Sequence, residues 1–190
     1  MTAVVWVALA VAMAATELRW ANRRPAVTTG PLGASARAAR ASDDALIACI
    51  AVALVGPVVS VAALGWAGGP GWVAGGAALA VLGVLLRVQA MRALRGRFML
   101  ALSEQPDDPR LVRDRCYAVL RHPGYTALLL VTVGLALVAA GPAGAVWALP
   151  VLALVVARIH VEEAMLAHEF GAEYDRYRAD VPARLVPRVW

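Results

Sequence analysis

Two polar clusters beside long apolar stretches contain the side chains best suited to chemistry in this sequence. The first is the run Arg-His-Pro-Gly-Tyr at residues 121–125, and the second extends over residues 158–177. Pro123 restricts His122 to extended geometry and can be the first residue of a following helix. The backbone N–H groups at such a helix start would be open to a carboxylate or another anion. The first cluster therefore predicts an anion-binding helix start.

The second cluster begins with Arg158, Glu162 and Glu163, directly after an apolar stretch. Arg158 and Glu162 are four residues apart and therefore share one face of a helix. An ion pair at the membrane edge explains this spacing, whereas ionisable residues that face the interior of a helix bundle are candidates for function. His122 is open to the same two interpretations. The spacing alone leaves both of them standing.

The composition is that of an integral membrane protein. Hydrophobic residues make up 61% of the 190 positions, and the mean hydropathy of +0.68 is above the range of soluble proteins. All 18 basic residues are arginines that gather between the apolar stretches, so the net charge of +5 indicates membrane topology rather than nucleic-acid binding. The two cysteines and three histidines lack the spacing of a disulfide framework or a zinc site. We therefore expect no nucleic-acid partner and no metal.

Five apolar stretches predict five membrane-spanning helices, at about residues 1–16, 45–66, 72–86, 126–140 and 145–157. Every charged residue falls in the segments 17–44 and 87–121 or in the tail that follows the fifth stretch. Arginine-rich loops favour the cytoplasm, so we expect the N-terminus outside and the C-terminus in the cytoplasm. Segment 17–44 is interpreted as a loop, and the tail as an amphipathic helix to about Arg178.

Three runs of residues in the second half of the chain together resemble a known family. They are Tyr-Ala-Val-Leu-Arg-His-Pro-Gly-Tyr at 117–125, Arg-Ile-His-Val-Glu-Glu at 158–163, and Phe-Gly-x-x-Tyr-x-x-Tyr at 170–177. Leu111-Val112 precedes the first run, and Val181-Pro182 and Pro187 follow the third. In this order and separation they resemble the isoprenylcysteine carboxyl methyltransferase family and its bacterial relatives, which share features with phospholipid methyltransferases. The resemblance covers roughly the last 80 residues together with the span count and topology.

The resemblance implies one all-α membrane domain, 1–190, in the bacterial inner membrane. Residues 1–91 would form three spans, and residues 92–190 the cofactor-binding and catalytic part with two spans and a cytoplasmic helical segment that closes the pocket. The implied cofactor is S-adenosyl-L-methionine, released as S-adenosyl-L-homocysteine, and the acceptor would arrive from the bilayer. The implied catalytic residues are Arg158, on the acceptor side, and Glu162. The implied cofactor-binding residues are Leu111, Val112, Tyr117, His122, Pro123, Gly124, Tyr125, Glu162 and Glu163.

The chemistry of S-adenosylmethionine agrees with these residue types. A carboxylate such as Glu162 can pair with its ammonium, and the rings of Tyr117 or Tyr125 suit a cation or the adenine. A carboxylate acceptor needs no general base and would be oriented by Arg158. A phenol or a thiol acceptor would need one, and Glu162, Glu163 and His122 are the available groups.

Other functions stay open at this point. The acceptor class is undecided among isoprenoid-type carboxylates, phenols and thiols, and a phospholipid-type methyltransferase is an alternative. A reductase or isomerase of membrane lipids would predict nicotinamide binding, but the sequence has no glycine-rich phosphate loop. A non-enzymatic lipid-binding or assembly protein would use the arginine-rich loops to bind anionic lipid, and it would tolerate loss of Glu162 or His122.

Overall fold

Helices dominate the part of the chain that the computed structural model describes, residues 33–64, 69–94 and 111–190. Within these ranges no strand occurs, so the all-α prediction is confirmed there. The helices in chain order are α2 (Gly33–Leu64), α3 (Pro70–Leu94), η1 (Arg115–Ala118), α4 (Pro123–Gly144), η2 (Ala145–Ala148), α5 (Leu149–Phe170) and α6 (Ala172–Asp180).

Two stretches of the described residues are long and apolar enough to cross a membrane, Pro70–Leu94 and Pro123–Phe170, and Ala45–Val59 is a shorter apolar helix. The second stretch contains α4, η2 and α5, and near the end of α4 the backbone leaves helical geometry at Ala140 and Gly141, where Gly141 has a φ of 58°. This positive φ is available to glycine without strain. Helices thus form at the second to fifth predicted spans, whereas the first, residues 1–16, lies outside the described residues.

The interpretation of residues 17–44 as a loop was wrong for its last part, because α2 already begins at Gly33. Residues 33–42 read Gly-Ala-Ser-Ala-Arg-Ala-Ala-Arg-Ala-Ser, which is rich in the strong helix formers alanine and arginine. Charge places a segment outside the apolar part of the bilayer, but it does not prevent a helix from forming there. The sequence therefore located the apolar segment and missed the helix that extends beyond it.

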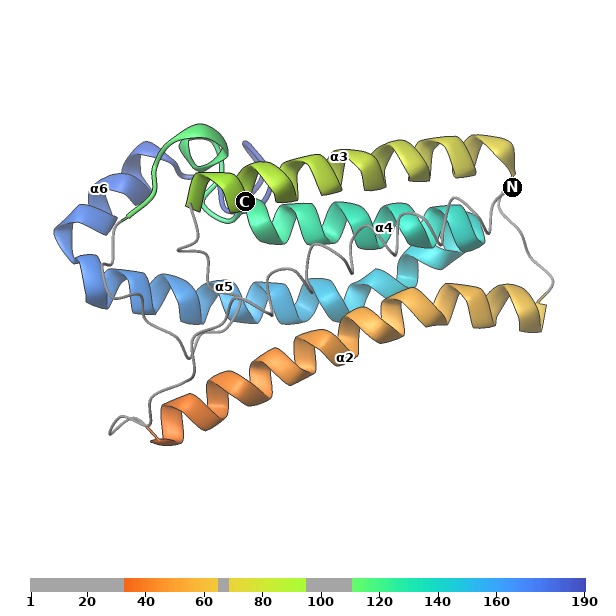
Figure 1. Cartoon of the computed structure of the whole chain (residues 1–190), viewed down its shortest axis with the longest axis horizontal. Coiled ribbons are helices and arrows are strands. Elements are labelled where there is room, and N and C mark those ends of the chain that lie inside the picture. The colour runs from red at the N-terminus through yellow and green to blue at the C-terminus, as the bar shows by residue number, and fades with distance from the viewer. Residues whose placement is uncertain (1–32, 65–68, 95–110) are drawn as a thin grey trace.

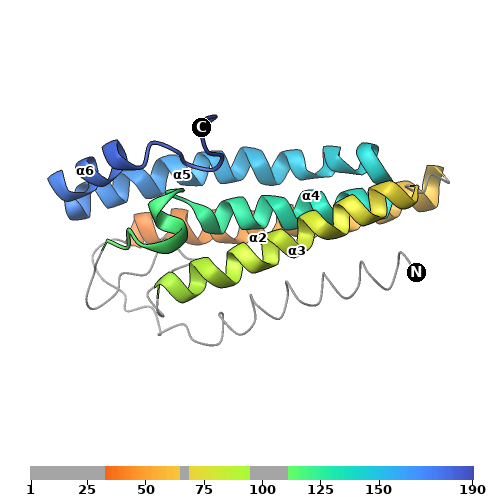
Figure 2. The same cartoon turned by 90° about the horizontal axis from the view of Figure 1, so that it is seen from above.

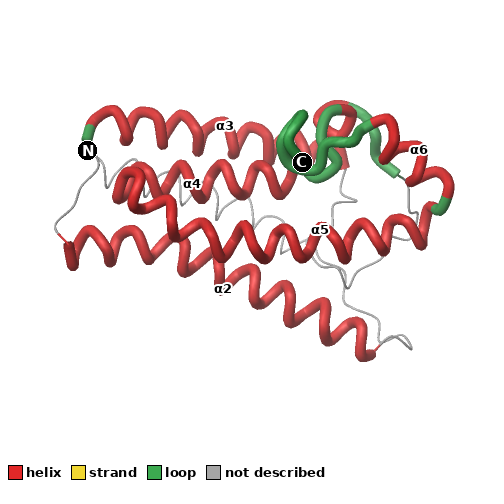
Figure 3. The backbone as a smooth tube through the Cα atoms, turned by 180° about the vertical axis from the view of Figure 1, so that it is seen from behind, coloured by secondary structure: helices red, strands yellow, loops and turns green. Residues whose placement is uncertain are grey.

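Helix α4 is the central element of the bundle. It lies between α3 and α5, which is visible in two perpendicular views (Figures 1 and 2). Helix α2 packs on both α4 and α5. The short helices η1 and α6 and the irregular C-terminal residues gather at one end of the bundle, where α4 begins (Figure 3).

Aliphatic side chains from three helices form the main core of the described part. They are Leu46 and Ala53 of α2, Leu128, Val131 and Leu135 of α4, and Val151, Val155 and Ile159 of α5, together with Leu185 of the tail. A chain segment after the last span therefore takes part in the same core as the spans. Its packing there brings the C-terminal residues to the start of α4.

Small residues allow α3 and α4 to approach closely. A Cβ added to Gly76 would lie 2.6 Å from the carbonyl oxygen of Gly134, and one added to Gly83 would lie 2.8 Å from that of Ala127. Such backbone-to-backbone contact is typical of helix packing in membranes. Gly75, the neighbour of Gly76, faces open space.

We therefore expect Gly76→Ala and Gly75→Ala to differ sharply although the two positions are adjacent. The first forces two backbones apart and should lower the free energy of unfolding by about 1–3 kcal/mol. The second meets no neighbouring atom, so its unfolding free energy should stay within about 1 kcal/mol of wild type. Thermal unfolding in detergent, followed by circular dichroism, measures both. Equal midpoints for the two variants would contradict the close contact of α3 and α4.

Candidate functional site

The start of α4 is fixed by Pro123, which is the first residue of the helix as predicted. His122 precedes it with a φ of −125°, and its carbonyl accepts hydrogen bonds from the N–H groups of Tyr125 and Thr126 at 3.1 and 3.2 Å. The side chain of His122 is buried. The rigid proline and these two bonds hold the imidazole at a defined place on the end of the bundle.

The C-terminal tail, residues 181–190, crosses this helix start and pairs with it. The N–H groups of Arg121 and His122 donate to the carbonyls of Ala183 and Arg184 at 2.9 and 3.0 Å. The hydroxyl of Thr126 donates to the carbonyl of Leu185 at 2.8 Å. Tail carbonyls thus occupy the amides of Arg121 and His122, which precede α4. The expectation that the first N–H groups of the helix are open to an anion is wrong for Tyr125 and Thr126, whose amides donate to the carbonyl of His122.

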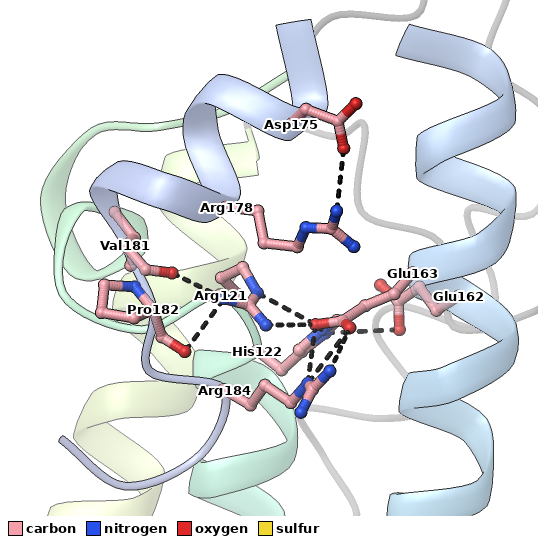
Figure 4. A network of polar contacts seen from close by, with 9 residues as sticks. All are labelled: Arg121, His122, Glu162, Glu163, Asp175, Arg178, Val181, Pro182 and Arg184. Atoms are coloured by element: carbon pink, nitrogen blue, oxygen red, sulfur yellow. Dashed lines mark hydrogen bonds and ion pairs between the residues drawn. The ribbon is translucent and has the colours of Figure 1, made fainter. Parts of the chain in front are cut away.

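Glu163 is the centre of a buried ionic cluster (Figure 4). Arg121 donates to its Oε1 from Nε at 2.9 Å, and the Arg121 Nη2 atom lies 2.8 Å from the same oxygen. Arg184 binds the carboxylate with Nε at 3.1 Å and Nη2 at 2.9 Å. The Nη1 of Arg121 also donates to the carbonyls of Val181 and Pro182 at 2.7 and 3.0 Å. The carboxylate of Glu163 is thus neutralised by two guanidinium groups and ties α5 to α4 and to the tail.

Glu162 lies in a different environment although it is the next residue. Its side chain is 34% exposed, against 8% for that of Glu163. Its Oε2 lies 3.7 Å from Nδ1 of His122, whose Nε2 lies 3.3 Å from Oε1 of Glu163. The imidazole is therefore placed between the two carboxylates. Of the two, Glu162 is the one that a ligand can reach.

Arg158 is fully enclosed one turn before Glu162, with 2% of its surface exposed. Its Nε donates to the hydroxyl of Tyr125 at 3.2 Å, and this hydroxyl also interacts with Glu162. A buried guanidinium beside a tyrosine hydroxyl and a carboxylate is an arrangement suited to holding a second carboxylate or phosphate in one orientation. Arg158, Tyr125 and Glu162 therefore form one polar group at the junction of α4 and α5.

Tyrosines close this end of the bundle. The hydroxyl of Tyr177, on α6, donates to the carbonyl of Tyr117, in η1, at 2.7 Å. Burial, and secondly the charge of Glu162, raise the pKa of Tyr117 well above its ordinary value, so its hydroxyl stays protonated at neutral pH. Burial and the nearby charge of Glu163 likewise raise the pKa of Tyr174 to about 12. The rings therefore act as neutral walls of the site.

The structure brings most of the sequence-predicted residues to this end of the bundle. Pro123 and Gly124 are buried in the first turn of α4, and Leu111 packs on the cluster of Tyr174 and Tyr177. Val112, beside Leu111, is partly buried. Tyr117, His122, Tyr125, Arg158, Glu162 and Glu163 are placed as described above.

Arg87 and Arg184 also form hydrogen bonds at this end of the bundle, and neither was among the predicted site residues. Arg87 of α3 is buried, and its Nη1 donates to the carbonyl of Gly124 at 3.3 Å. Its position directly after the apolar stretch 72–86 was a usable signal, because an ionisable residue at the end of a span that faces a bundle interior is a candidate for function. Arg184 had no such signal, since it stands in a polar tail. Only the folded tail shows that it reaches Glu163.

Comparison with known proteins agrees with the expected resemblance. Residues 72–173 match the phospholipid methyltransferase family. A protein-S-isoprenylcysteine O-methyltransferase from Mus musculus is 35% identical over 112 residues, which are 58% of this chain and 40% of that protein. The Arabidopsis thaliana protein-S-isoprenylcysteine O-methyltransferase B is 31% identical over 110 residues, 57% of this chain and 56% of that protein. The matches thus span about half the length of these relatives or less. Because the matched family region extends over more than half of the chain and contains α3, α4 and α5, the chain belongs to the phospholipid methyltransferase family.

Proposed function

We propose that this protein transfers a methyl group from S-adenosylmethionine to a small lipophilic acceptor at the cytoplasmic face of a bacterial inner membrane. The observation that carries the proposal is the polar group of Glu162, Tyr125 and Arg158, enclosed where α4 and α5 meet. Family membership supports the reaction class. The names of the curated relatives support an oxygen atom of a carboxylate, attached to an isoprenoid-type chain, as the methyl acceptor.

The residues present fit S-adenosylmethionine as the donor. This cofactor carries an ammonium and a sulfonium, so its site needs a carboxylate that is accessible and not already neutralised. Glu163 does not satisfy this condition, because Arg121 and Arg184 bind it. Glu162 satisfies the condition better. A third of its side chain is exposed, and the nitrogen that lies 3.7 Å from its Oε2 belongs to the ring of His122 rather than to a guanidinium. When bound, the cofactor would supply an activated methyl group on its sulfonium sulfur.

The side chains of this protein would then bind, orient and exclude water. Glu162 would pair with the ammonium, and the rings of Tyr117 and Tyr125 would lie against the cation or the adenine. Arg158 would hold the acceptor carboxylate in line, which converts binding energy into correct orientation. A carboxylate acceptor is already a nucleophile, and the protonated Tyr117 provides no phenolate base. Positioning and dehydration would therefore provide most of the acceleration.

The charge distribution supports the proposed topology. Arg121, Arg158 and Arg184 converge at the end of the bundle where α4 begins, and α6 with its further charges lies at the same end. Arginine-rich ends favour the cytoplasmic side, where S-adenosylmethionine is available. Five spans with an outside N-terminus are the topology that we propose for the whole chain.

Calorimetric titration of S-adenosylmethionine and S-adenosylhomocysteine into the detergent-solubilised protein tests the donor site. Wild type should bind both ligands, and Glu162→Gln should weaken binding about tenfold to a hundredfold, the value of a hydrogen bond to a charged group. Glu169→Gln, an exposed position on the same helix, should bind as wild type does. Absence of heat and of thermal stabilisation with wild type would rule out the proposed reaction. Unchanged affinity in Glu162→Gln would move the ammonium site elsewhere.

A further inference from the structure

We propose that Arg184 is a positioning residue that couples the C-terminal tail to the donor site through Glu163 and His122. The inference rests on the proposed function, because the residue that it ultimately orients is Glu162. It adds a residue that is not itself among those that carry the family resemblance, and it assigns Glu163 to the support of the site rather than to the ligand. Three connected observations lead to it.

The first observation is that Arg184 connects three parts of the molecule. Its guanidinium binds the carboxylate of Glu163 on α5 through Nε at 3.1 Å and Nη2 at 2.9 Å. Its carbonyl accepts the N–H of His122 at 3.0 Å, directly before α4. Its guanidinium carbon also lies 5.0 Å from the ring centroid of Trp190, and its N–H donates to the Trp190 carbonyl at 2.9 Å. Arg184 thus joins the tail to α5 and to the start of α4, and it also connects two residues within the tail.

The second observation is a continuous line of contacts from Arg184 to Glu162 (Figure 4). The Oε1 atom of Glu163 lies 3.3 Å from Nε2 of His122, and Nδ1 of the same ring lies 3.7 Å from Oε2 of Glu162. The imidazole is a rigid ring, so a change in the position of Glu163 is passed to the opposite nitrogen. Because only 2% of the His122 side chain is exposed, the packing leaves it little freedom to absorb such a change.

The third observation concerns the charge of the cluster. Arg121 and Arg184 share the carboxylate of Glu163. The hydrogen bond between Arg184 and Glu163 raises the pKa of Arg184 above its ordinary value. Without Arg184, the carboxylate would keep Arg121 and would depend more strongly on His122. The imidazole would then be drawn to Glu163 and away from Glu162. Loss of Arg184 should therefore disturb the donor site as well as the tail.

Hydrogen exchange of the unliganded protein tests the attachment of the tail without any ligand. In Arg184→Gln, peptides that contain the amides of Arg121 and His122 should exchange faster, because the carbonyls of Ala183 and Arg184 no longer stay in place. Arg184→Lys should restore part of the protection, since it keeps the charge. Arg178→Gln, which removes an exposed ion pair with Asp175, is the control and should exchange as wild type does. Unchanged exchange in Arg184→Gln would overturn the inference.

A double-mutant cycle then tests the coupling to Glu162, with S-adenosylhomocysteine as the probe. Arg184→Gln should weaken binding about tenfold in the wild-type background and less than about twofold in the Glu162→Gln background. An equal loss in both backgrounds would mean a general structural role, and no loss in either would mean no coupling; both outcomes overturn the inference. If wild type binds no probe, the donor site and this coupling fall together. The exchange result then separately decides whether the tail is attached as described.

Discussion

Glu163→Ala is expected to lower the free energy of unfolding by about 3–5 kcal/mol, the cost of leaving a buried charge without its partner. The substitution removes the carboxylate that Arg121 and Arg184 share, and only 4% of the Arg121 side chain is exposed. The carbonyls of Val181 and Pro182 still accept hydrogen bonds from Arg121, but they cannot neutralise it. Chemical unfolding in detergent, followed by circular dichroism, measures the loss.

Glu173→Ala is the matched control for that measurement. Glu173 also binds an arginine, Arg113, at 2.6 Å, but its side chain is 52% exposed. Water screens this pair, so its removal should change the free energy of unfolding by less than about 1 kcal/mol. Similar losses for the two variants would show that burial of the Glu163 cluster is not what stabilises this end of the bundle.

Arg158→Lys is expected to lower kcat/KM for an isoprenoid carboxylic acid about a hundredfold, within the cost of truncating one partner of a buried charge pair. Lysine keeps the charge but cannot offer the planar fork that fixes a carboxylate. The affinity for S-adenosylhomocysteine should change less than about twofold, because the donor's ammonium is assigned to Glu162. A methyl-transfer assay and a calorimetric titration on the same preparation measure the two quantities.

Arg176→Lys, on the exposed face of α6, is the control and should leave both quantities unchanged. A phenolic acceptor offers a second comparison, since it has no carboxylate for the guanidinium to hold and should lose much less activity. If the affinity for S-adenosylhomocysteine fell as much as kcat/KM in Arg158→Lys, this arginine would belong to the donor site instead. An unchanged kcat/KM for the carboxylic acid would remove it from the acceptor site.

The helices of this protein follow from local features of the sequence. Apolar length indicated where α3 to α5 and the apolar part of α2 run, and Pro123 marked the first residue of α4 because its fixed φ suits that position. Gly141 provided the positive φ at the reversal between α4 and α5. These features act within a few residues, so the sequence alone contains enough information to place them.

The division of roles between Glu162 and Glu163 could not be obtained in this way. Consecutive residues on a helix point about 100° apart, so Glu162 and Glu163 must face different surroundings. The sequence pattern does not say which of the two is buried. Which glutamate is enclosed depends on a tertiary contact of the tail. Arg184, 21 residues after Glu163 in the chain, folds back across α4 and binds that carboxylate. The residue types pointed to this polar group, and the folded chain distinguishes its partly exposed carboxylate from its buried one.

Pairing between the start of α4 and the tail determines when the site can be completed during synthesis. Helices α3, α4 and α5 can pack in the membrane as soon as they are made, because their contacts lie within residues 70–170. The partners of Arg121 in the tail are about 60 residues later in the chain, at Val181 and Pro182. A nascent chain would therefore hold an inserted but open bundle, and the polar end of the bundle would be complete only when the tail has paired with it.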